Sequence, residues 1–362
     1  MSKFFPLKVS NIIRETADAN TIVFEKPAGA DFEYKPGQYL TLKADINGES
    51  TRRAYSLCSS PITDPALAVT VKRVEGGVMS NYLPDHLKVG DVMEVLPPMG
   101  NFVVELDAGK FQHYVLIAGG SGITPLMSIA KSVLQEEPYS KVSLFYANRD
   151  VESIIFRKEL MEMEATYADR IKVVHNLDTA PADWTGLTGV PNRMQLFPVM
   201  QDIIDRDNLP KVFYMCGPLG MMEEAQAALS FMGVSPDQIK RELFTAPQKT
   251  AEAESAVAPA ATDNGEVEGK PGDYSILVML DGDEKTVEVK QSVTILEAVL
   301  DAGMDPPYAC QMGVCTTCRA KTHVGTVEME EDEGLSDSEI ADGYILTCMA
   351  HPMTPNCKIE FM

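Results

Sequence analysis

Four cysteines near the end of the chain carry the strongest chemical signal. Cys310, Cys315 and Cys318 stand on one short stretch, and Cys348 follows thirty residues later. Three thiolates on a loop and a fourth at a distance have the spacing typical of a two-iron, two-sulfur cluster. A loop around a cluster needs a residue free of Cβ strain, with backbone N–H groups turned toward sulfur, and Gly313 lies inside this loop. The pattern predicts a [2Fe–2S] centre with these four ligands.

Structural zinc is the alternative for four cysteines, since zinc also takes thiolate ligands. Zinc ligands usually come in two close pairs, whereas the fourth cysteine here stands alone, so the spacing favours iron–sulfur. The other three cysteines, Cys58, Cys216 and Cys357, are expected to be small buried hydrophobic residues. Cysteines committed to iron rather than to disulfides indicate a reducing, cytoplasmic setting.

A glycine-rich turn in the middle of the chain has the composition of a nucleotide site. The stretch Gly119–Pro125 reads GGSGITP, follows an apolar strand and opens a helical pattern. Glycines let the backbone approach a pyrophosphate, and the helix N-terminus supplies N–H donors. Thr124 suits the N-cap of this helix, and Pro125 suits its first position.

A second strand-to-helix turn, Cys216–Met222, reads CGPLGMM. In open α/β sheets ligands bind at the carboxyl ends of the strands, so both turns are expected to line one crevice. The alternative is that Gly217 and Pro218 merely end a strand.

Two further motifs stand in the first hundred residues. Arg53–Ser56 reads RAYS, and Gly76–Ser80 reads GGVMS ahead of an apparent helix. An arginine can bind phosphate through two hydrogen bonds, and a tyrosine offers a flat face for stacking. By themselves these motifs are not diagnostic, because Arg53 would serve equally well as a surface charge.

The elements that must position these motifs fall into three segments and a linker. Residues 1–106 hold short strands broken by turns, which predicts a small antiparallel β-barrel. Residues 107–245 alternate buried-type strands with helical patterns, as at 125–134 and 156–167, which predicts a doubly wound α/β domain. Residues 246–272 are rich in Ala, Glu and Pro and predict a linker of roughly 30 Å as a flexible coil. Residues 273–362 hold the cluster cysteines.

The charge balance excludes some classes of function. The chain of 362 residues has a net charge of −22, which argues against sequence-independent nucleic-acid binding. It has no run of 18 apolar residues, so no membrane span is expected. From Gly265 to the end, 19 acidic side chains stand against six basic ones. This excess is either a solvated surface or a means of steering toward a basic partner.

Taken in order, the motifs R-x-Y-S, G-G-x-x-S, G-G-S-G-I-T-P, C-G-P and the cysteine set resemble the ferredoxin-NADP⁺ reductase superfamily with a C-terminal plant-type ferredoxin domain. The resemblance covers nearly the whole chain. It implies a multidomain fold, with an antiparallel β-barrel that binds FAD, an α/β doubly wound domain that binds NADP, and an α+β ferredoxin domain of the β-grasp type. FAD in place of FMN rests on the resemblance alone. The stretches around Gly37–Gln38 and Pro307–Cys310 resemble the reductase subunits of phenylacetyl-CoA epoxidases.

The resemblance also implies roles for matching residues. Arg53 would bind a flavin phosphate, Tyr55 would lie against the flavin, and Ser56 would hydrogen-bond near flavin N5. Further residues would present helix N-termini and turns to the FAD pyrophosphate and to the nicotinamide cofactor: Gly77, Val78, Ser80, Gly119, Gly120, Gly122 and Thr124.

The residues expected nearest the reacting atoms are Ser56, Cys216 and Phe244. By resemblance, Cys216 and Gly217 would lie beside the nicotinamide, and Phe244 would be an aromatic lid near the flavin, although here the chain continues past it. Cofactor choice depends on the end of the second nucleotide-binding strand, where an arginine accommodates the 2′-phosphate of NADP. Arg149 therefore favours NADPH over NADH, although the acidic Asp150 follows it directly.

The resemblance thus implies an electron-transfer enzyme. NADPH would give a hydride to FAD, and electrons would pass singly to the [2Fe–2S] cluster and on to an oxygenase, with a diiron epoxidase of phenylacetate degradation as the expected partner. The chemistry belongs to the cofactors and needs no general acid or base, and the motifs contain no catalytic dyad. Two alternatives stay open, a reductase for another diiron hydroxylase or desaturase, and a non-catalytic iron–sulfur sensor.

Overall fold

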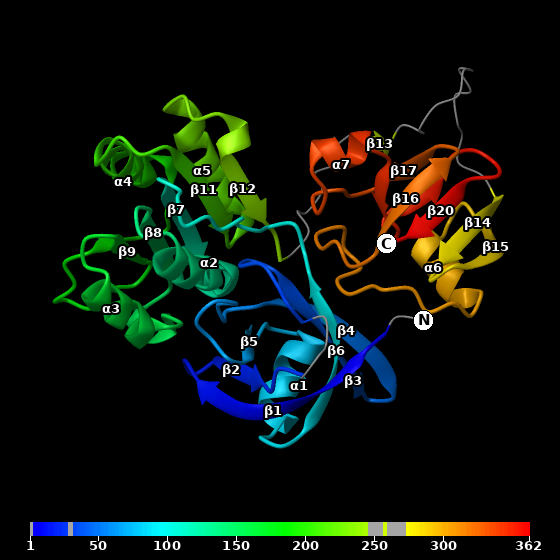
Figure 1. The fold of residues 1–362 in the computed structure, drawn as a ribbon, viewed down its shortest axis with the longest axis horizontal. Coiled ribbons are helices and arrows are strands. Elements are labelled where there is room, and N and C mark those ends of the chain that lie inside the picture. Colours follow the sequence, from blue (N-terminus) through cyan, green and yellow to red (C-terminus); the bar gives the residue numbers. More distant parts are fainter. Residues whose placement is uncertain (1–2, 28–31, 245–255, 259–272) are drawn as a thin grey trace. The chain divides into compact units, whose positions relative to one another are not determined.

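The computed structural model describes residues 3–27, 32–244, 256–258 and 273–362 (Figure 1). Internal contacts divide the chain into two compact units. One comprises the described residues of Phe5–Thr51 and Tyr55–Glu242, and the other contains Lys3, Phe4, Arg52–Ala54 and the described residues from Leu243 onward. In the part of the chain that the structure describes, no helix is long and apolar enough to cross a membrane.

The first hundred residues form an antiparallel sheet of six strands in the order β4-β3-β6-β1-β2-β5. A bridge between Leu57, which directly follows β4, and Val69 of β5 joins the two edge strands, so the sheet closes into a barrel. The barrel core is aliphatic and aromatic, with Leu40 and Phe24 fully buried. The elements are β1 (Phe5–Arg14), β2 (Ala19–Phe24), β3 (Tyr39–Ile46), β4 (Glu49–Ser56), β5 (Leu67–Lys72), α1 (Val78–His86) and β6 (Val92–Met99).

The next segment is a parallel sheet in the order β10-β9-β8-β7-β11-β12. From β7 the chain proceeds outward through β8, β9 and β10, and then returns to the other side of β7 with β11. The strand order therefore reverses between β7 and β11, which is the switch point where such sheets bind ligands. The strands are β7 (His113–Gly119), β8 (Lys141–Asn148), β9 (Ile171–Leu177), β10 (Leu187–Thr188), β11 (Lys211–Cys216) and β12 (Ile239–Glu242).

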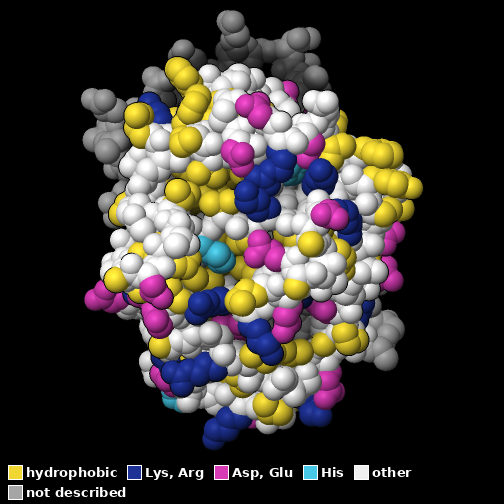
Figure 2. Space-filling view, turned by 90° about the vertical axis from the view of Figure 1, so that its left-hand side faces the viewer, with side chains coloured by type: hydrophobic (Ala, Val, Ile, Leu, Met, Phe, Trp, Pro, Cys, Tyr) yellow, Lys and Arg dark blue, Asp and Glu magenta, His cyan; other side chains and the backbone are white. Residues whose placement is uncertain are grey.

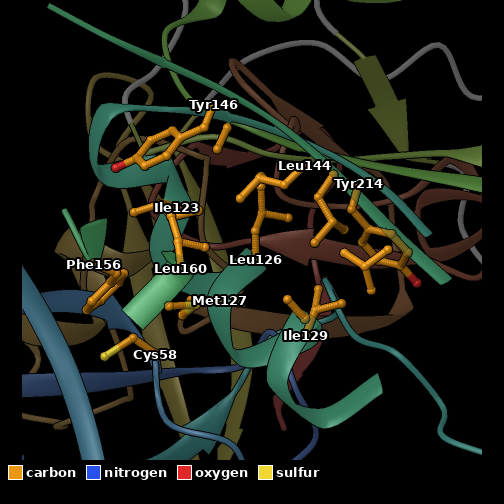
Figure 3. Packing of buried hydrophobic residues seen from close by; sticks show 14 of the residues in the cluster. Cys58, Ile123, Leu126, Met127, Ile129, Leu144, Tyr146, Phe156, Leu160 and Tyr214 are labelled. Atoms are coloured by element: carbon orange, nitrogen blue, oxygen red, sulfur yellow. The ribbon is translucent and has the colours of Figure 1, made fainter. Parts of the chain in front are cut away.

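Helix α2 packs on β7, β8 and β11 and fills the centre of this unit. Figure 3 shows Ile123, Leu126 and Met127 among side chains of the strands, with Cys58 of the barrel segment in the same cluster. Burying each such side chain contributes about 1.5–3 kcal/mol. The α-helices and 3₁₀ helices (η) of the parallel-sheet segment are η1 (Gly120–Gly122), α2 (Ile123–Glu136), η2 (Val151–Ser153), α3 (Arg157–Thr166), α4 (Arg193–Asp205), α5 (Leu219–Phe231) and η3 (Pro236–Gln238).

The last segment has a mixed sheet, β15-β14-β20-β16-β18, and a smaller sheet, β13-β17-β19. The hairpin between β14 and β15 turns on Asp281 and Gly282, both at positive φ, as a tight two-residue hairpin turn requires. Within the predicted linker only 256–258 are described, as β13; the other linker residues lie outside the described residues. The elements are β13 (Ala256–Ala258), β14 (Tyr274–Leu280), β15 (Asp283–Val289), α6 (Ile295–Asp301), β16 (Arg319–Val324), β17 (Val327–Met329), α7 (Asp337–Ala341), β18 (Tyr344–Leu346), β19 (Ala350–Pro352) and β20 (Lys358–Phe361).

Candidate functional site

The two glycine turns meet at the switch point of the parallel sheet. β7 and β11 are neighbours, and Ala118 pairs with Cys216 at their carboxyl ends. A Cβ on Gly122 would lie 2.0 Å from the carbonyl oxygen of Cys216, and a Cβ on Gly119 would lie 2.5 Å from Pro218. Only glycine allows the two turns to approach this closely. The two turns therefore meet backbone to backbone at the carboxyl ends of β7 and β11, and the crevice expected between them stays a prediction.

The helix that follows the first turn begins earlier than the sequence predicts. Gly122 is the N-cap of α2, and no side chain caps this end of the helix. The prediction that Thr124 is the N-cap is wrong, because its hydroxyl donates to the carbonyl of Ser121 at 3.0 Å and the residue lies inside the first turn. Pro125 is the third helical residue, where its missing N–H is also harmless. The uncapped first turn fits the phosphates of a dinucleotide.

The carboxyl end of β8 supplies a second test of whether a dinucleotide fits. Asn148 is 5% exposed, and within the described residues its side-chain amide makes no hydrogen bond of good geometry. A buried amide at this edge is a group that a bound ligand can satisfy. Arg149 lies 3.2 Å from Asp18, and Asp150 accepts the backbone N–H of Ser153 at 2.8 Å as the N-cap of η2. Asp150 is thus engaged by the protein itself.

Lys72 at the end of β5 is a residue that sequence reasoning missed. Its ammonium nitrogen lies 3.6 Å from the place that a Cβ on Gly120 would occupy. The same ammonium is 4.0 Å from Asp18, the partner of Arg149. The positive charge of Lys72 beside the glycine turn would attract a bound anion, as the partial positive charge at the N-terminus of α2 does. The only sequence signal is a lysine at the end of a strand, which is common on protein surfaces.

A serine, a cysteine and a glutamate converge at the end of β11. Ser56 ends β4, and its hydroxyl donates to the carboxylate of Glu242 at 3.1 Å. Glu242 ends β12, where it pairs with Cys216. Burial raises the pKa of Glu242 to about 8, which the hydrogen bond from Ser56 partly offsets. Burial also raises the pKa of Cys216 well above its usual value, and the nearby Glu242 acts in the same direction. This carboxyl was not expected to take part in chemistry.

The motif residues of the barrel lie on β4 and at the start of α1. Arg53 and Tyr55 are partly exposed and share one face of β4, because they are two residues apart on a strand. Gly77 is the N-cap of α1, and no side chain caps the helix there. A Cβ on Gly77 would lie 2.3 Å from the hydroxyl of Ser80, so the turn is shaped for glycine. Val78 is 51% exposed. An open helix N-terminus of this kind fits a flavin pyrophosphate.

The four predicted cluster ligands come together in the structure. Hydrogen bonding with Cys315 and Cys348 holds the pKa of Cys310 well below its usual value, and hydrogen bonding with Cys348 lowers the pKa of Cys318. These interactions require the four sulfur atoms to lie close to one another. Cys310 is partly buried and the other three are buried. Cys348 thus comes from a different stretch of chain than the other three cysteines, and the fold brings all four sulfur atoms together.

The loop around these sulfurs is built as the sequence indicates. Gly313 has a φ of 72°, and a Cβ there would lie 2.7 Å from Glu331. The backbone N–H of Met312 donates to the sulfur of Cys310 at 3.4 Å, and Gln311 also has a positive φ. Backbone donors turned toward sulfur fit a bound cluster. Among the described residues, no group of three or more His, Cys, Asp or Glu side chains is placed around one metal ion, and a two-iron cluster shares its four ligands between two irons.

A cavity of about 450 Å³ lies at the other edge of the parallel sheet. Its lining includes His113, Lys141 and Ile171, the first residues of β7, β8 and β9. His113 is hydrogen-bonded to the hydroxyl of Ser143 at 2.9 Å, and its other ring nitrogen lies 3.2 Å from Asp207. Cofactors of open α/β sheets bind at the carboxyl edge, so this cavity is separate from the candidate site.

Phe244, the third residue predicted near the reacting atoms, belongs to the unit that begins at Leu243, whereas Ser56 and Cys216 belong to the other unit. It lies two residues after the end of β12 and is 39% exposed. Its assignment as a lid stays a prediction. Ser56 and Cys216, the other two, are brought together around Glu242.

Three models of known families match the chain in sequence. The model described as oxidoreductase FAD-binding domain matches residues 6–104, the one described as oxidoreductase NAD-binding domain matches 116–227, and the one described as 2Fe-2S iron-sulfur cluster binding domain matches 278–353. The third match confirms the iron–sulfur interpretation of the cysteines over zinc.

Relatives of known function match over the full length. The ferredoxin reductase component of 3-ketosteroid-9-alpha-monooxygenase from Mycobacterium tuberculosis is 37% identical over 365 residues, which cover 98% of this chain and 95% of the relative. A component of the 1,2-phenylacetyl-CoA epoxidase from Escherichia coli is 34% identical over 364 residues, which cover 100% and 98%. The structure of phthalate dioxygenase reductase is 23% identical with a TM-score of 0.60, covers 99% of this chain and 98% of its own, and shows a similar fold.

These findings confirm the predicted three-domain fold class and an oxidoreductase that uses FAD, NAD(P)H and a [2Fe–2S] cluster. The predicted domain boundaries stay predictions. The chain belongs to the ferredoxin-reductase-type flavin oxidoreductases, which unite an FAD-binding, an NAD-binding and a 2Fe-2S domain and serve oxygenases as their reductase components.

Proposed function

We propose that this chain carries electrons from NADPH through FAD to its [2Fe–2S] cluster and from there to a diiron oxygenase. The convergence of Ser56, Cys216 and Glu242 at the switch point carries the proposal, because it joins the end of a barrel strand to the nucleotide crevice. When bound, the nicotinamide gives a hydride to the flavin, and the cluster accepts electrons singly. The protein supplies positions and protons around that chemistry.

We assign the site residues the roles that the sequence motifs imply. Arg53 and Tyr55 bind and orient the flavin from β4, and Arg149 holds the 2′-phosphate of the nucleotide. Phe244 excludes water as a lid. Uncapped helix ends and glycine turns bind the two pyrophosphates through Gly77, Val78, Ser80, Gly119, Gly120, Gly122, Thr124 and Gly217. Cys310, Cys315, Cys318 and Cys348 are the iron ligands.

Glu242 adds a proton site that no sequence motif indicates. With a pKa of about 8, its carboxyl is mostly protonated at neutral pH and can release the proton as the environment changes. The Ser56 hydroxyl donates to Oε2 when Glu242 is ionised. In the protonated acid the Oε2–H would instead donate to Ser56 Oγ, and a proton would move through the hydroxyl when Oγ accepts it and releases its own proton to a further acceptor. Cys216 stays a neutral thiol, because burial disfavours its thiolate. Its part is to shape the nicotinamide pocket.

The preference for NADPH rests on Arg149. Its neighbour Asp150 is occupied in capping η2, so the carboxylate that complicates the sequence pattern is held by backbone. Arg149 itself is 66% exposed and is paired with Asp18 through one nitrogen. Arg149→Ala should weaken NADPH binding about tenfold and leave NADH binding unchanged, measured as the nucleotide concentration that half-saturates flavin bleaching. Equal losses for both nucleotides would contradict this role.

The acidic segment beside the cluster supports docking of a basic partner surface. Seven acidic side chains and no basic one lie between Glu328 and Glu339. This segment touches the cluster loop, because Gly334 donates its N–H to the carbonyl of Gly313 at 2.8 Å and Glu331 packs against the same glycine. By contrast, the face drawn in Figure 2 intersperses basic and acidic side chains. Complementary charge mainly raises the rate of encounter.

The proposed client is the oxygenase of a phenylacetyl-CoA epoxidase, with a ketosteroid monooxygenase as second candidate. The first is supported by the motif stretches and by the 34% identical relative, and the second by the 37% identical relative. The first experiment is the visible spectrum of the purified chain under anaerobic conditions before and after NADPH. Flavin and iron–sulfur bands that bleach support the electron path, and a chain without them contradicts it. Product formation with each oxygenase component then decides the client.

A further inference from the structure

Helix α2 carries two serines that are fully buried in an otherwise apolar setting. Ser128 and Ser132 have no measurable exposure, and the residues around them on the helix are Met127, Ile129 and Val133. Serine is not favoured in a helix interior, because its hydroxyl competes with the backbone for hydrogen bonds. A buried hydroxyl also needs a partner. The partners of these two serines show what the helix is fixed to.

Both hydroxyls reach the segment that follows β4. Ser128 donates to the carbonyl of Ser59 at 2.6 Å. Ser132 donates to the carbonyl of Ser128 at 2.7 Å, so its contact with Ser60 at 2.8 Å uses the Ser60 hydroxyl as donor. The oxygen of Ser60 in turn accepts the backbone N–H of Ile62 at 3.1 Å. Every hydroxyl in this chain of hydrogen bonds has its partners.

An ion pair strengthens the same contact. The ammonium of Lys131 lies 2.6 Å from Asp64 in the segment after β4 and 3.2 Å from Glu159 on α3. Lys131 is only 15% exposed, so the pair is screened less than a surface pair. Figure 3 shows Cys58, from the same segment, packed near Met127. Polar and apolar contacts thus bind one side of α2 to residues 58–64.

The two segments that meet in this contact, α2 and residues 58–64, are each next in the chain to one part of the candidate site. Gly122, the N-cap of α2, is six residues before Ser128, or about 9 Å along the helix. On the other side, Ser56 of the proposed flavin site is only three residues before Ser59. The contact therefore connects the nucleotide turn to the flavin strand through two short pieces of chain, one of them helical.

We propose that the hydroxyl seam, defined as Ser59, Ser60, Ser128 and Ser132, positions the nicotinamide relative to the flavin for hydride transfer. These are positioning residues, which would act through the nucleotide turn and the flavin strand rather than by binding a cofactor themselves. The inference rests on the proposed function. Hydride transfer needs the reacting atoms within a narrow range of separation, and a misplacement of about 1 Å lowers the rate on the order of a hundredfold. Hydrogen bonds define such a register more sharply than apolar packing, because they depend on direction.

The test is the double variant Ser128→Ala/Ser132→Ala, which removes both α2 hydroxyls without adding volume. We expect the rate constant of flavin reduction by NADPH to fall about tenfold, with the half-saturating nucleotide concentration unchanged and a larger isotope effect from deuterated nucleotide. The matched control is Ser140→Ala/Ser143→Ala. It removes two buried hydroxyls at the amino edge of the sheet, and both make their hydrogen bonds to residues of the α/β domain, Glu137 and His113, rather than to residues 58–64.

Each outcome decides the proposal. Loss of rate in the seam variant and not in the control, with a similar drop in melting temperature of both, supports positioning. Equal rates in parent, seam variant and control would overturn it while leaving the proposed function intact. A parent whose flavin no nicotinamide nucleotide reduces would overturn both. If the double variant does not fold, Ser128→Ala alone replaces it, and Ser128→Thr, which keeps a hydroxyl, should recover the rate.

Discussion

Replacing Glu242 by glutamine tests the most perturbed carboxyl of the site. The pKa of Glu242 is raised from 4.5 to about 8, chiefly by burial. Between these two values the folded chain holds a proton that the unfolded chain has released, so stability is greatest below about pH 4.5 and falls as the pH rises through 8. Glutamine cannot titrate. The variant should therefore lose this part of the pH dependence.

The size of the effect follows from the two pKa values. At about 1.36 kcal/mol per pKa unit, raising the pH from 6 to 9 would lower the free energy of unfolding by about 2.5 kcal/mol in the parent relative to Glu242→Gln. Because the side chain is only partly buried, solvent screening reduces this difference, and we expect about 1–2 kcal/mol. Glutamine keeps an acceptor for the Ser56 hydroxyl, so it preserves the contact.

The assay is urea unfolding of the FAD-loaded chain at pH 6 and pH 9, followed by tryptophan and flavin fluorescence. Glu25→Gln is the control, because its side chain is 54% exposed and pairs with Lys8, which is exposed to the same degree. Parent and Glu242→Gln should diverge with pH, whereas parent and control should not. Parallel pH dependence in all three chains would show that Glu242 titrates in its ordinary range and would remove the proposed proton site.

Three further outcomes follow from the same structure. Gly122→Ala should weaken NADPH binding at least tenfold, because its Cβ would lie 2.0 Å from the Cys216 carbonyl, whereas Gly220→Ala on α5 meets nothing within 4 Å and should leave flavin reduction unchanged. Gly313→Ala should lower the iron content and the cluster absorbance per flavin, since this glycine has a φ of 72° and lies against Glu331. Electron transfer to an oxygenase component should fall several-fold between 50 and 500 mM salt while reduction of ferricyanide does not, and salt independence would leave the acidic segment without a role in docking.

The motifs that could be predicted from sequence are those whose physical cause is local. The turn at Gly119–Gly122 and the loop at Gly313 need backbone conformations or approaches that side chains forbid, so glycine itself is the signal. The cysteine spacing is equally local. Even here the start of a helix was placed wrongly, since Thr124 bonds backward to Ser121 and Gly122 begins α2. Cap geometry depends on a preceding 3₁₀ turn that composition alone does not specify.

Glu242 could not be recognised in this way, because its chemistry depends on distant residues. Its hydrogen-bond partner Ser56 is 186 positions away, and its neighbour Cys216 lies on another strand. In sequence it is one acidic residue in a short strand of a chain with 53 acidic residues. Burial shifts its pKa, and burial at this point arises only when β4 and β12 meet. A titrating group of this kind is a property of tertiary structure.

Helix α2 shows why the same limit affects the positioning of the cofactors. The sequence pattern correctly predicted a helix near 125–134, and a solvent-facing helix would carry polar side chains on one side. In the structure Ser128 and Ser132 are polar and buried, because the sheet covers one side of α2 and residues 58–64 cover another. Serines in an apolar helix thus mark a surface that two parts of the chain share. In the proposal made here, that shared surface connects the two cofactor sites, and a hydroxyl at these positions fixes the register between them where an apolar side chain would only fill space.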